Sequence, residues 1–583
     1  MKVMSKQFFQ IILSVSAMAF LIACSPYQGQ HKHKTRLASS DESSQLLQSD
    51  YPYSEGDDIP AIAYMHHDET YNAESVIPPQ CYTKTEGVNN PCYACHQSYD
   101  RSEARPNQMG DGTLQGNYEF SDVGLRNSWK NLFVDRQALI ESIPDKDIDL
   151  WVDEDNYHQA LSAAVTSAQK QEYDFLEAQP LPANMRLANL GNPDIAFSKN
   201  GLATDGSFWV AYNYKPFPST FWPTNGSFGD AMIRLPKDFR NINGKFSEAI
   251  YFLNLAAVEL AMKDLESVTI YPFNEKAHGI DINGDDLLSE SVNRLVKPSH
   301  YFGDAKNTSL ARMLYPQGSE FLHTVRYLDE NEKGDILPSK RMKEVRYMQK
   351  HLFRSRESLA SAYYAEAKDK HFEQLPQTRY LGERGIDNGF GWTINAFIEN
   401  KSGELRPQHE QELAYCNGCH KSVGASFDQT FSFVRKAPGI DGWGYIDLAS
   451  LTDAPNINEE LGEYLTYMTR VGGGDEFRQN TEMLDKWFDD DGKIKASEVA
   501  NTPSLQALIV PSPERARKLN KAYFTIVQEQ SYLFGRDATI STAKNVIEKI
   551  DTEQAPLLDE HQYKWDMRLD WAHQSGLNLA KEN

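Results

Sequence analysis

Two copies of one five-residue pattern contain four of the six cysteines in this chain of 583 residues. The copies are Cys92-Tyr93-Ala94-Cys95-His96 and Cys416-Asn417-Gly418-Cys419-His420, so both match C-x-x-C-H. Two thiols three positions apart can reach both vinyl groups of one haem macrocycle, and the adjacent histidine can turn its imidazole onto the iron. The pattern therefore predicts two covalently bound haem c groups, one at each copy.

Zinc sites and redox dithiols also use C-x-x-C pairs. A zinc site would require the two pairs to converge. Neither alternative explains why a histidine follows both pairs. Haem is therefore the favoured interpretation, and zinc or a redox dithiol remains the alternative.

The N-terminus has the features of a secretory signal. Lys2 and Lys6 precede an apolar stretch that ends Leu21-Ile22-Ala23-Cys24, and this ending resembles the lipobox of bacterial lipoproteins. Residues 1–23 are then a signal peptide, Cys24 is the lipidated first residue, and 24–60 is a flexible tether. By the same resemblance, Ser25 favours the outer membrane of a Gram-negative cell envelope, with the periplasmic side preferred to the cell surface. The alternative is an ordinary signal peptide or a short membrane anchor.

Together, the signal and the two motifs resemble dihaem c-type cytochromes. The resemblance covers only these short segments. It implies that the two haems are attached through thioether bonds to Cys92, Cys95, Cys416 and Cys419. It implies proximal iron ligation through His96 and His420.

The ligands on the other face of each haem are left open by the sequence. For the first haem the candidates are His66, His67 and Met109. For the second they are His409 and Met468. The alternatives to ligation are that the two adjacent histidines are simply solvated and that the methionine packs in the apolar core. The choice of ligand matters because His/Met ligation gives a haem a higher reduction potential than ligation by two histidines.

Charge excludes one class of partner. Acidic residues outnumber basic ones 82 to 59, which gives a net charge of −23. Such a surface is not built to neutralise nucleic-acid phosphates. It would instead attract redox partner proteins with basic docking patches, and the lipid would hold the chain at a membrane.

The remaining chain divides into three segments by composition and pattern. These are a loop-rich first haem module at 61–128, a middle mixed α/β region at 129–400, and a mainly helical second haem module at 401–583. The predicted fold is multidomain and mainly α, with a smaller β component and long ordered loops.

Three local patterns carry the predicted secondary structure. Residues 247–265 read as a helix capped by Ser247, and Ser512-Pro513 opens a second long helix. Val325-Arg326-Tyr327 and Val345-Arg346-Tyr347 repeat a pattern 20 residues apart, which indicates two strands of one sheet.

Two further features have less specific interpretations. Cys81 is left over after four haem cysteines and one lipidated cysteine, and it could be a ligand, a reactive thiol or a buried apolar residue. Asp281, Asn283 and Asp285 supply oxygens at alternate positions, as in a calcium loop, but the turn glycine and terminal glutamate are missing. Calcium and a solvated acidic turn both remain open.

The favoured function is single-electron transfer in the cell envelope by a dihaem lipoprotein. One alternative is a dihaem peroxidase or oxygenase that acts on peroxide or a small substrate. His96 and His420 are 324 residues apart, which is wide for such enzymes. A second alternative is a binding protein with structural haems. Whether the chain is an enzyme is undecided.

Overall fold

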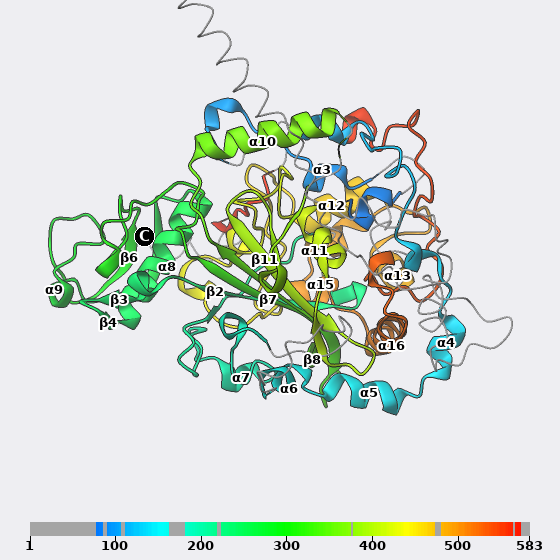
Figure 1. The fold of residues 1–583 in the computed structure, drawn as a ribbon, viewed down its shortest axis with the longest axis horizontal. Coiled ribbons are helices and arrows are strands. Elements are labelled where there is room, and N and C mark those ends of the chain that lie inside the picture. The colour runs from blue at the N-terminus through cyan, green and yellow to red at the C-terminus, as the bar shows by residue number, and fades with distance from the viewer. Residues whose placement is uncertain are drawn as a thin grey trace, which may run out of the picture. The chain divides into compact units, whose positions relative to one another are not determined.

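The computed structural model describes residues 77–84, 90–106, 111–162, 181–218, 223–372, 374, 377–472, 480–563 and 566–572. All of them belong to one compact unit, Tyr53–Asn583 (Figure 1). The predicted signal peptide, Cys24 and the tether lie outside the described residues, as do His66, His67 and Met109. Within the described ranges, no helix combines the length and apolar character that a membrane span requires.

An antiparallel sheet of eight strands forms the middle of this unit (Figure 1). The strand order is β1-β2-β7-β8-β11-β10-β9, with β12 paired to β11. The strands are β1 (Val210–Ala211), β2 (Phe228–Arg234), β7 (Glu320–Glu330), β8 (Ile336–Lys350), β9 (Arg379–Tyr380), β10 (Ile386–Asp387), β11 (Trp392–Glu399) and β12 (Leu405–Pro407). Two smaller sheets pair β3 (Asn241–Ile242) with β4 (Lys245–Phe246) and β5 (Ser267–Phe273) with β6 (Val292–Val296).

Strands β7 and β8 confirm the prediction from the repeated pattern. Val325-Arg326-Tyr327 lies in β7, Val345-Arg346-Tyr347 lies in β8, and the two strands pair directly. Successive side chains alternate between the faces of a sheet. Phe321 accordingly packs into one apolar cluster and Leu322 into another, so both faces of the sheet are covered.

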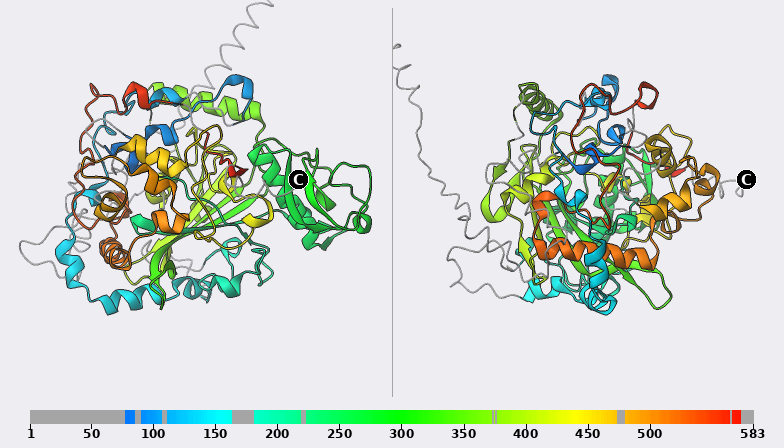
Figure 2. Two further views of the ribbon diagram at one scale, coloured as in Figure 1. Left: turned by 180° about the vertical axis from the view of Figure 1, so that it is seen from behind. Right: turned by 90° about the vertical axis from the view of Figure 1, so that its right-hand side faces the viewer.

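Helices surround the sheet. Those in the described ranges are α3 (Cys92–Cys95), α4 (Gln137–Ser142), α5 (Asp145–Asp153), α6 (Asn156–Ser162), α7 (Pro193–Ala196), α8 (Glu248–Lys263), α9 (Glu275–His278), α10 (Arg356–His371), α11 (Glu410–Asn417), α12 (Glu463–Val471), α13 (Thr481–Trp487), α14 (Ala496–Ala500), α15 (Leu505–Ile509) and α16 (Pro513–Glu529). Helices α5 and α16 contact each other and strand β7 (Figures 1 and 2).

The two long helices that begin at a serine cap are confirmed. Ser247 Oγ accepts the Ile250 N–H at 3.4 Å, and α8 follows it. Ser512 Oγ accepts the Arg515 N–H at 3.3 Å, with Pro513 in the first turn of α16. Helix α8 is apolar on nearly every side because it lies between the eight-stranded sheet and the β5–β6 sheet (Figures 1 and 2).

The prediction of a mainly α fold is wrong, because the large antiparallel sheet organises the core. Its strands carry buried charged residues that hide the usual alternation of apolar and polar residues. Arg326 pairs with Asp230 at 3.0 Å, and Arg341 pairs with Glu399 at 2.9 Å. All four side chains are at most 1% exposed. Read by hydropathy, such strands look like surface segments.

Candidate functional site

The first C-x-x-C-H motif contacts the segment that follows the second motif. The Ala425 N–H, five residues after His420, donates to the Cys95 carbonyl at 3.1 Å. Cys92 and Cys416 also belong to the same buried apolar cluster. The fold therefore brings together segments that are more than 300 residues apart in the sequence, as Cys95 and Ala425 are.

The first motif forms a single helical turn. In α3 the two cysteines stand at positions i and i+3, which share one side of a helix. His96 ends the turn, and its N–H donates to the Cys92 carbonyl at 2.8 Å. The Gln115 side-chain amide donates to the His96 carbonyl at 2.5 Å and to the Tyr563 carbonyl at 2.8 Å. This amide ties the motif to a segment near the C-terminus.

The cysteine thiols of the first motif are not paired with each other. None of the five cysteines in the described ranges forms a disulfide. The Cys92 thiol donates to Asn90 Oδ1 at 2.9 Å, and burial, with Cys95 nearby, raises the pKa of Cys92 well above its usual range. The Asn90 side-chain amide in turn donates to the Cys81 carbonyl at 3.1 Å. Cys81 thus sits in the wall of this site, with its side chain half-buried.

The second motif follows from helix α11. His409 precedes the helix, and its backbone N–H donates to Glu412 Oε2 at 3.1 Å. Arg406 holds the same carboxylate with two hydrogen bonds of 2.8 and 2.9 Å. After the helix ends, the His420 N–H donates to the Cys416 carbonyl at 2.9 Å. The chain therefore turns just where the pattern places the histidine.

The imidazole of His420 is fixed by a backbone carbonyl. Its Nδ1–H donates to the Gln429 carbonyl at 2.7 Å. A carbonyl can only accept, so Nε2 is the basic nitrogen of this ring. Burial lowers the pKa of His420 to about 4, which keeps the ring neutral at physiological pH. A neutral imidazole with Nδ1 held by a carbonyl is the usual arrangement of a metal-binding histidine.

A strained turn presents that carbonyl. Phe427 and Thr430 exchange two backbone hydrogen bonds of 2.9 Å. Asp428 and Gln429 between them have φ of +47° and +60°, in the left-handed region. Such conformations cost about 1 to 3 kcal/mol each for residues other than glycine, so the surroundings must hold the turn. Lys350 pairs with the Asp428 carboxylate, which also accepts the Tyr315 N–H at 2.9 Å.

A histidine that the sequence analysis did not single out lies near the second motif. His323 is in β7, and its Nδ1–H donates to the Asp230 backbone carbonyl. Burial, with Arg346 on β8, lowers the pKa of His323 to about 4, and His420 adds a smaller effect in the same direction. Arg346 also interacts electrostatically with His420 and Cys416. A signal existed in the sequence, since His323 stands between Phe321 and Val325 at the alternate positions of a strand, which share one face of a sheet.

The described candidates for distal ligands fall in two places. Met468 is buried in α12, and the carbonyl of its neighbour Tyr467 accepts a hydrogen bond from the Tyr93 hydroxyl at 3.2 Å. Helix α12 therefore contacts the first motif, although Met468 was considered for the second haem. His409 is half-buried with Nε2 3.5 Å from Glu412 Oε1, and its Nδ1 has no hydrogen-bond partner among the described residues.

The donor set fits haem attachment. Each motif offers two unbridged thiols and one histidine, and the His420 ring is neutral and fixed with Nε2 as its basic nitrogen. Among the described residues, no group of three or more His, Cys, Asp or Glu side chains is placed to hold a metal ion directly. Haem needs no such group, because the macrocycle supplies four of the ligands to its iron.

In the predicted calcium loop, several side-chain oxygens accept hydrogen bonds from other residues of the same loop. Asp281 Oδ1 accepts the Gly284 N–H at 2.8 Å, and Oδ2 accepts the Asp286 N–H at 2.9 Å. The Asn283 amide donates to Asp285 Oδ2 at 2.9 Å. Calcium at this loop stays a prediction.

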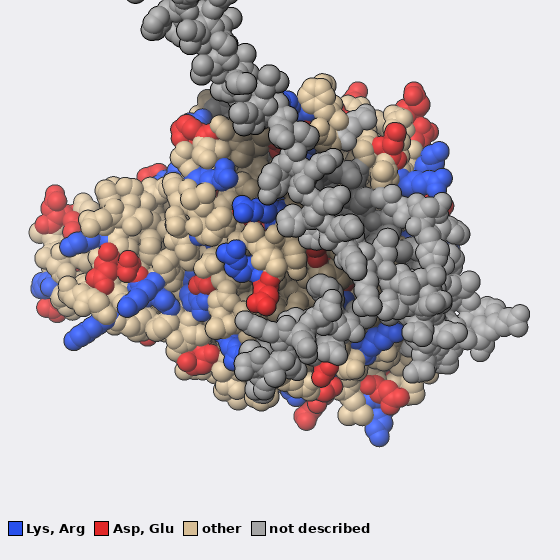
Figure 3. Space-filling view, in the orientation of Figure 1, with Lys and Arg blue, Asp and Glu red and all other residues tan. Residues whose placement is uncertain are grey.

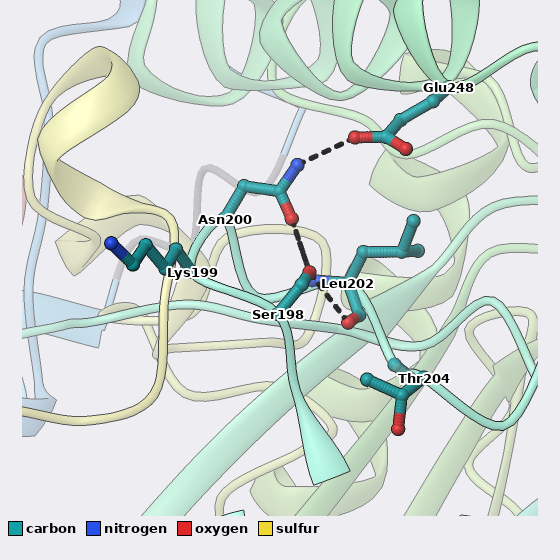
Figure 4. A pocket seen from close by; sticks show the side chains of 7 residues that line it. Ser198, Lys199, Asn200, Leu202, Thr204 and Glu248 are labelled. Atoms are coloured by element: carbon teal, nitrogen blue, oxygen red, sulfur yellow. Dashed lines mark hydrogen bonds between the residues drawn. The ribbon is translucent and has the colours of Figure 1, made fainter. Parts of the chain in front are cut away.

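A surface pocket of about 410 Å³ lies elsewhere (Figure 4). Asn200 donates to Glu248 Oε1 at 2.8 Å across it, and Ser198 donates to Asn200 Oδ1 at 2.6 Å. None of its lining residues belongs to either motif. This pocket is therefore separate from the two motifs.

Comparison with known proteins assigns the chain to a family. A model of a lipoprotein family matches residues 65–510. A protein of Aquifex aeolicus (strain VF5), described as an uncharacterized lipoprotein, is 30% identical over 542 residues, which cover 82% of this chain and 89% of the relative. No solved structure matches the chain.

The resemblance to dihaem c-type cytochromes is therefore wrong as a family assignment. It depended on a signal and two motifs of five residues, and segments this short recur on unrelated folds. The coarser prediction, a lipid-anchored protein of the cell envelope, agrees with the family. This chain belongs to the family of lipoproteins whose model spans residues 65–510.

Proposed function

We propose that this lipoprotein carries one covalently attached haem at each C-x-x-C-H motif and passes single electrons between partner proteins of the cell envelope. The observation that carries the proposal is the contact between the first motif and the segment that follows the second, through the Ala425–Cys95 hydrogen bond of 3.1 Å, together with one shared apolar cluster. The residues of both motifs would therefore hold their haems against this one apolar cluster.

The chain's own residues would hold and tune these groups. When bound, each haem supplies an iron that cycles between the ferric and ferrous states. His420 would ligate through Nε2, because Gln429 holds Nδ1–H. The thiols of Cys416 and Cys419 would form the thioether bonds, and the surrounding apolar cluster would exclude water. Rigid support of this kind suits electron transfer, since little has to move when the charge changes.

Anchoring and partner choice are parts of the same proposal. Lipidation at Cys24 would tether the chain to the outer membrane on its periplasmic side, within reach of soluble redox partners. The net charge of −23 favours partners with basic docking patches. On the face in Figure 3, acidic and basic side chains are interspersed over the described surface. Attraction there would come from net charge and would weaken as salt increases.

A haem count tests the attachment. The full-length lipoprotein should retain haem after denaturation and titrate to two haems per chain by its alkaline pyridine spectrum. Changing both cysteines of one motif to serine should leave one haem. Cys81→Ser is the matched control, and it should leave two. A chain without covalent haem, or with zinc in its place, would end the proposal.

Reactivity separates the carrier from an enzyme. A carrier should have low-spin haems that exchange electrons with a redox partner and do not turn over peroxide. A high-spin haem in the wild type that reacts rapidly with peroxide would favour the enzyme and contradict the carrier.

A further inference from the structure

His323 occupies a position on the sheet that faces the second motif. In the antiparallel register, His323 of β7 stands opposite Ala231 of β2 on one side and Arg346 of β8 on the other. The face that carries these residues packs into the apolar cluster that contains Cys416. A histidine in the middle of a strand is thus directed to the same cluster as the motif.

The ring of His323 is fixed in orientation. Its Nδ1–H donates to the backbone carbonyl of Asp230. Asp230 itself is held in place, because its side-chain carboxylate accepts hydrogen bonds from Arg326 and from the Thr324 hydroxyl. On the neighbouring position of β2, a Cβ on Gly229 would lie 2.7 Å from Cε1 and 3.2 Å from Nε2 of His323. The edge of the ring that contains Nε2 therefore runs past Gly229, where only a glycine leaves room.

His323 and His420 share one arrangement. Each ring donates Nδ1–H to a backbone carbonyl, so each has Nε2 as its basic nitrogen. In the sheet, Arg346 pairs with His323 of β7 on one side and with Ala396 of β11 on the other, and helix α11, which leads to His420, packs on β11. Outer hydrogen bonds of this kind typically orient metal-binding histidines.

We propose that His323 is the second axial ligand of the haem attached at Cys416, Cys419 and His420. This inference rests on the proposed function, because it needs a haem at that motif. Two imidazoles would make the haem low-spin and would give it a lower potential than a His/Met pair. The described alternatives are less well placed, since the helix of Met468 contacts the first motif and the His409 side chain lies beside Glu412.

Spectroscopy of the full-length protein tests the assignment without an activity measurement. His323→Gly should convert one of the two ferric haems from low-spin to high-spin, and added imidazole should restore it. His323→Met should keep the haem low-spin and raise its potential. His300→Ala is the matched control, because His300 is exposed and its ring forms hydrogen bonds with the hydroxyls of Ser299 and Ser309. This control should leave both haems unchanged.

Two results would overturn the assignment. One is an unchanged spin state of both haems in His323→Gly. The other is conversion to high spin in His409→Gly and not in His323→Gly. If His323→Gly fails to fold, near-infrared magnetic circular dichroism of the wild type still decides, because the absence of any bis-histidine signature would refute the inference. A wild type without haem would refute the proposed function itself, and the pyridine spectrum would reveal this before any variant is made.

Discussion

Lys350→Met should destabilise the protein by about 3 to 5 kcal/mol, the usual loss when one partner of a buried ion pair is removed. The side chains of Lys350 and Asp428 are 0% and 1% exposed. Asp428 Oδ2 keeps the Tyr315 N–H, but Oδ1 has no hydrogen-bond partner among the described residues. The variant would therefore leave a buried carboxylate with a single hydrogen bond. The Asp428 turn also presents the Gln429 carbonyl to His420, so the environment of that ring should loosen.

Urea unfolding, followed by circular dichroism, measures the loss. The double variant Lys350→Met/Asp428→Asn should recover more than half of it, because the asparagine is neutral and can still accept the Tyr315 N–H. Lys340→Met is the matched control. Its pair with Asp153 is 48% and 60% exposed, so the loss should stay below about 1 kcal/mol. If Lys350→Met costs no more than this control, the pair does not hold the turn.

Three further changes test other parts of the structure. Ser512→Ala should cost about 1 kcal/mol in urea unfolding, because it removes the cap of α16, and an unchanged midpoint would contradict the cap. Burial alone would raise the pKa of Glu344, but Arg346 and Arg536 outweigh it and lower the pKa to about 2. The stabilisation, about 3 kcal/mol, is present above pH 4.5 and lost as the pH falls to about 2, so the gap in stability between the wild type and Glu344→Gln should close over that range. A constant gap would refute this. Gly229→Ala should cost about 1 to 3 kcal/mol and perturb one haem spectrum, since its Cβ would lie 2.7 Å from the His323 ring, and a silent substitution would show that the ring has room.

Local signals in the sequence were sufficient for the capped helices. Ser247 and Ser512 each stand before a helix that the structure contains, because capping depends only on residues within one turn. The Val-Arg-Tyr pattern correctly identified β7 and β8 as partners. These features need no knowledge of distant parts of the chain.

The large sheet was missed for a physical reason. Its strands bury Arg326, Arg341 and Glu344 in ion pairs, and a charged residue in a sequence normally indicates the surface. The partners that make burial possible, such as Asp230 and Glu399, are far away in the sequence. Hydropathy alone therefore could not reveal the strands.

The candidate site also has features that local sequence patterns predict and features that depend on distant parts of the chain. The cysteines and histidines of the motifs form local patterns that can be read directly from the sequence, and their role stays a prediction. The Ala425–Cys95 hydrogen bond and the position of His323 beside Arg346 depend on how the sheet forms and packs, and no local pattern predicts them. The family could not be identified from ten residues either.

Peptide mass spectrometry of the purified full-length lipoprotein tests the central claim most directly. Proteolysis should yield two modified peptides, one with haem on Cys92 and Cys95 and one with haem on Cys416 and Cys419. The alkaline pyridine spectrum of the same sample should give two haems per chain. Unmodified cysteines in both peptides, from cells that attach haem to other proteins normally, would contradict the account.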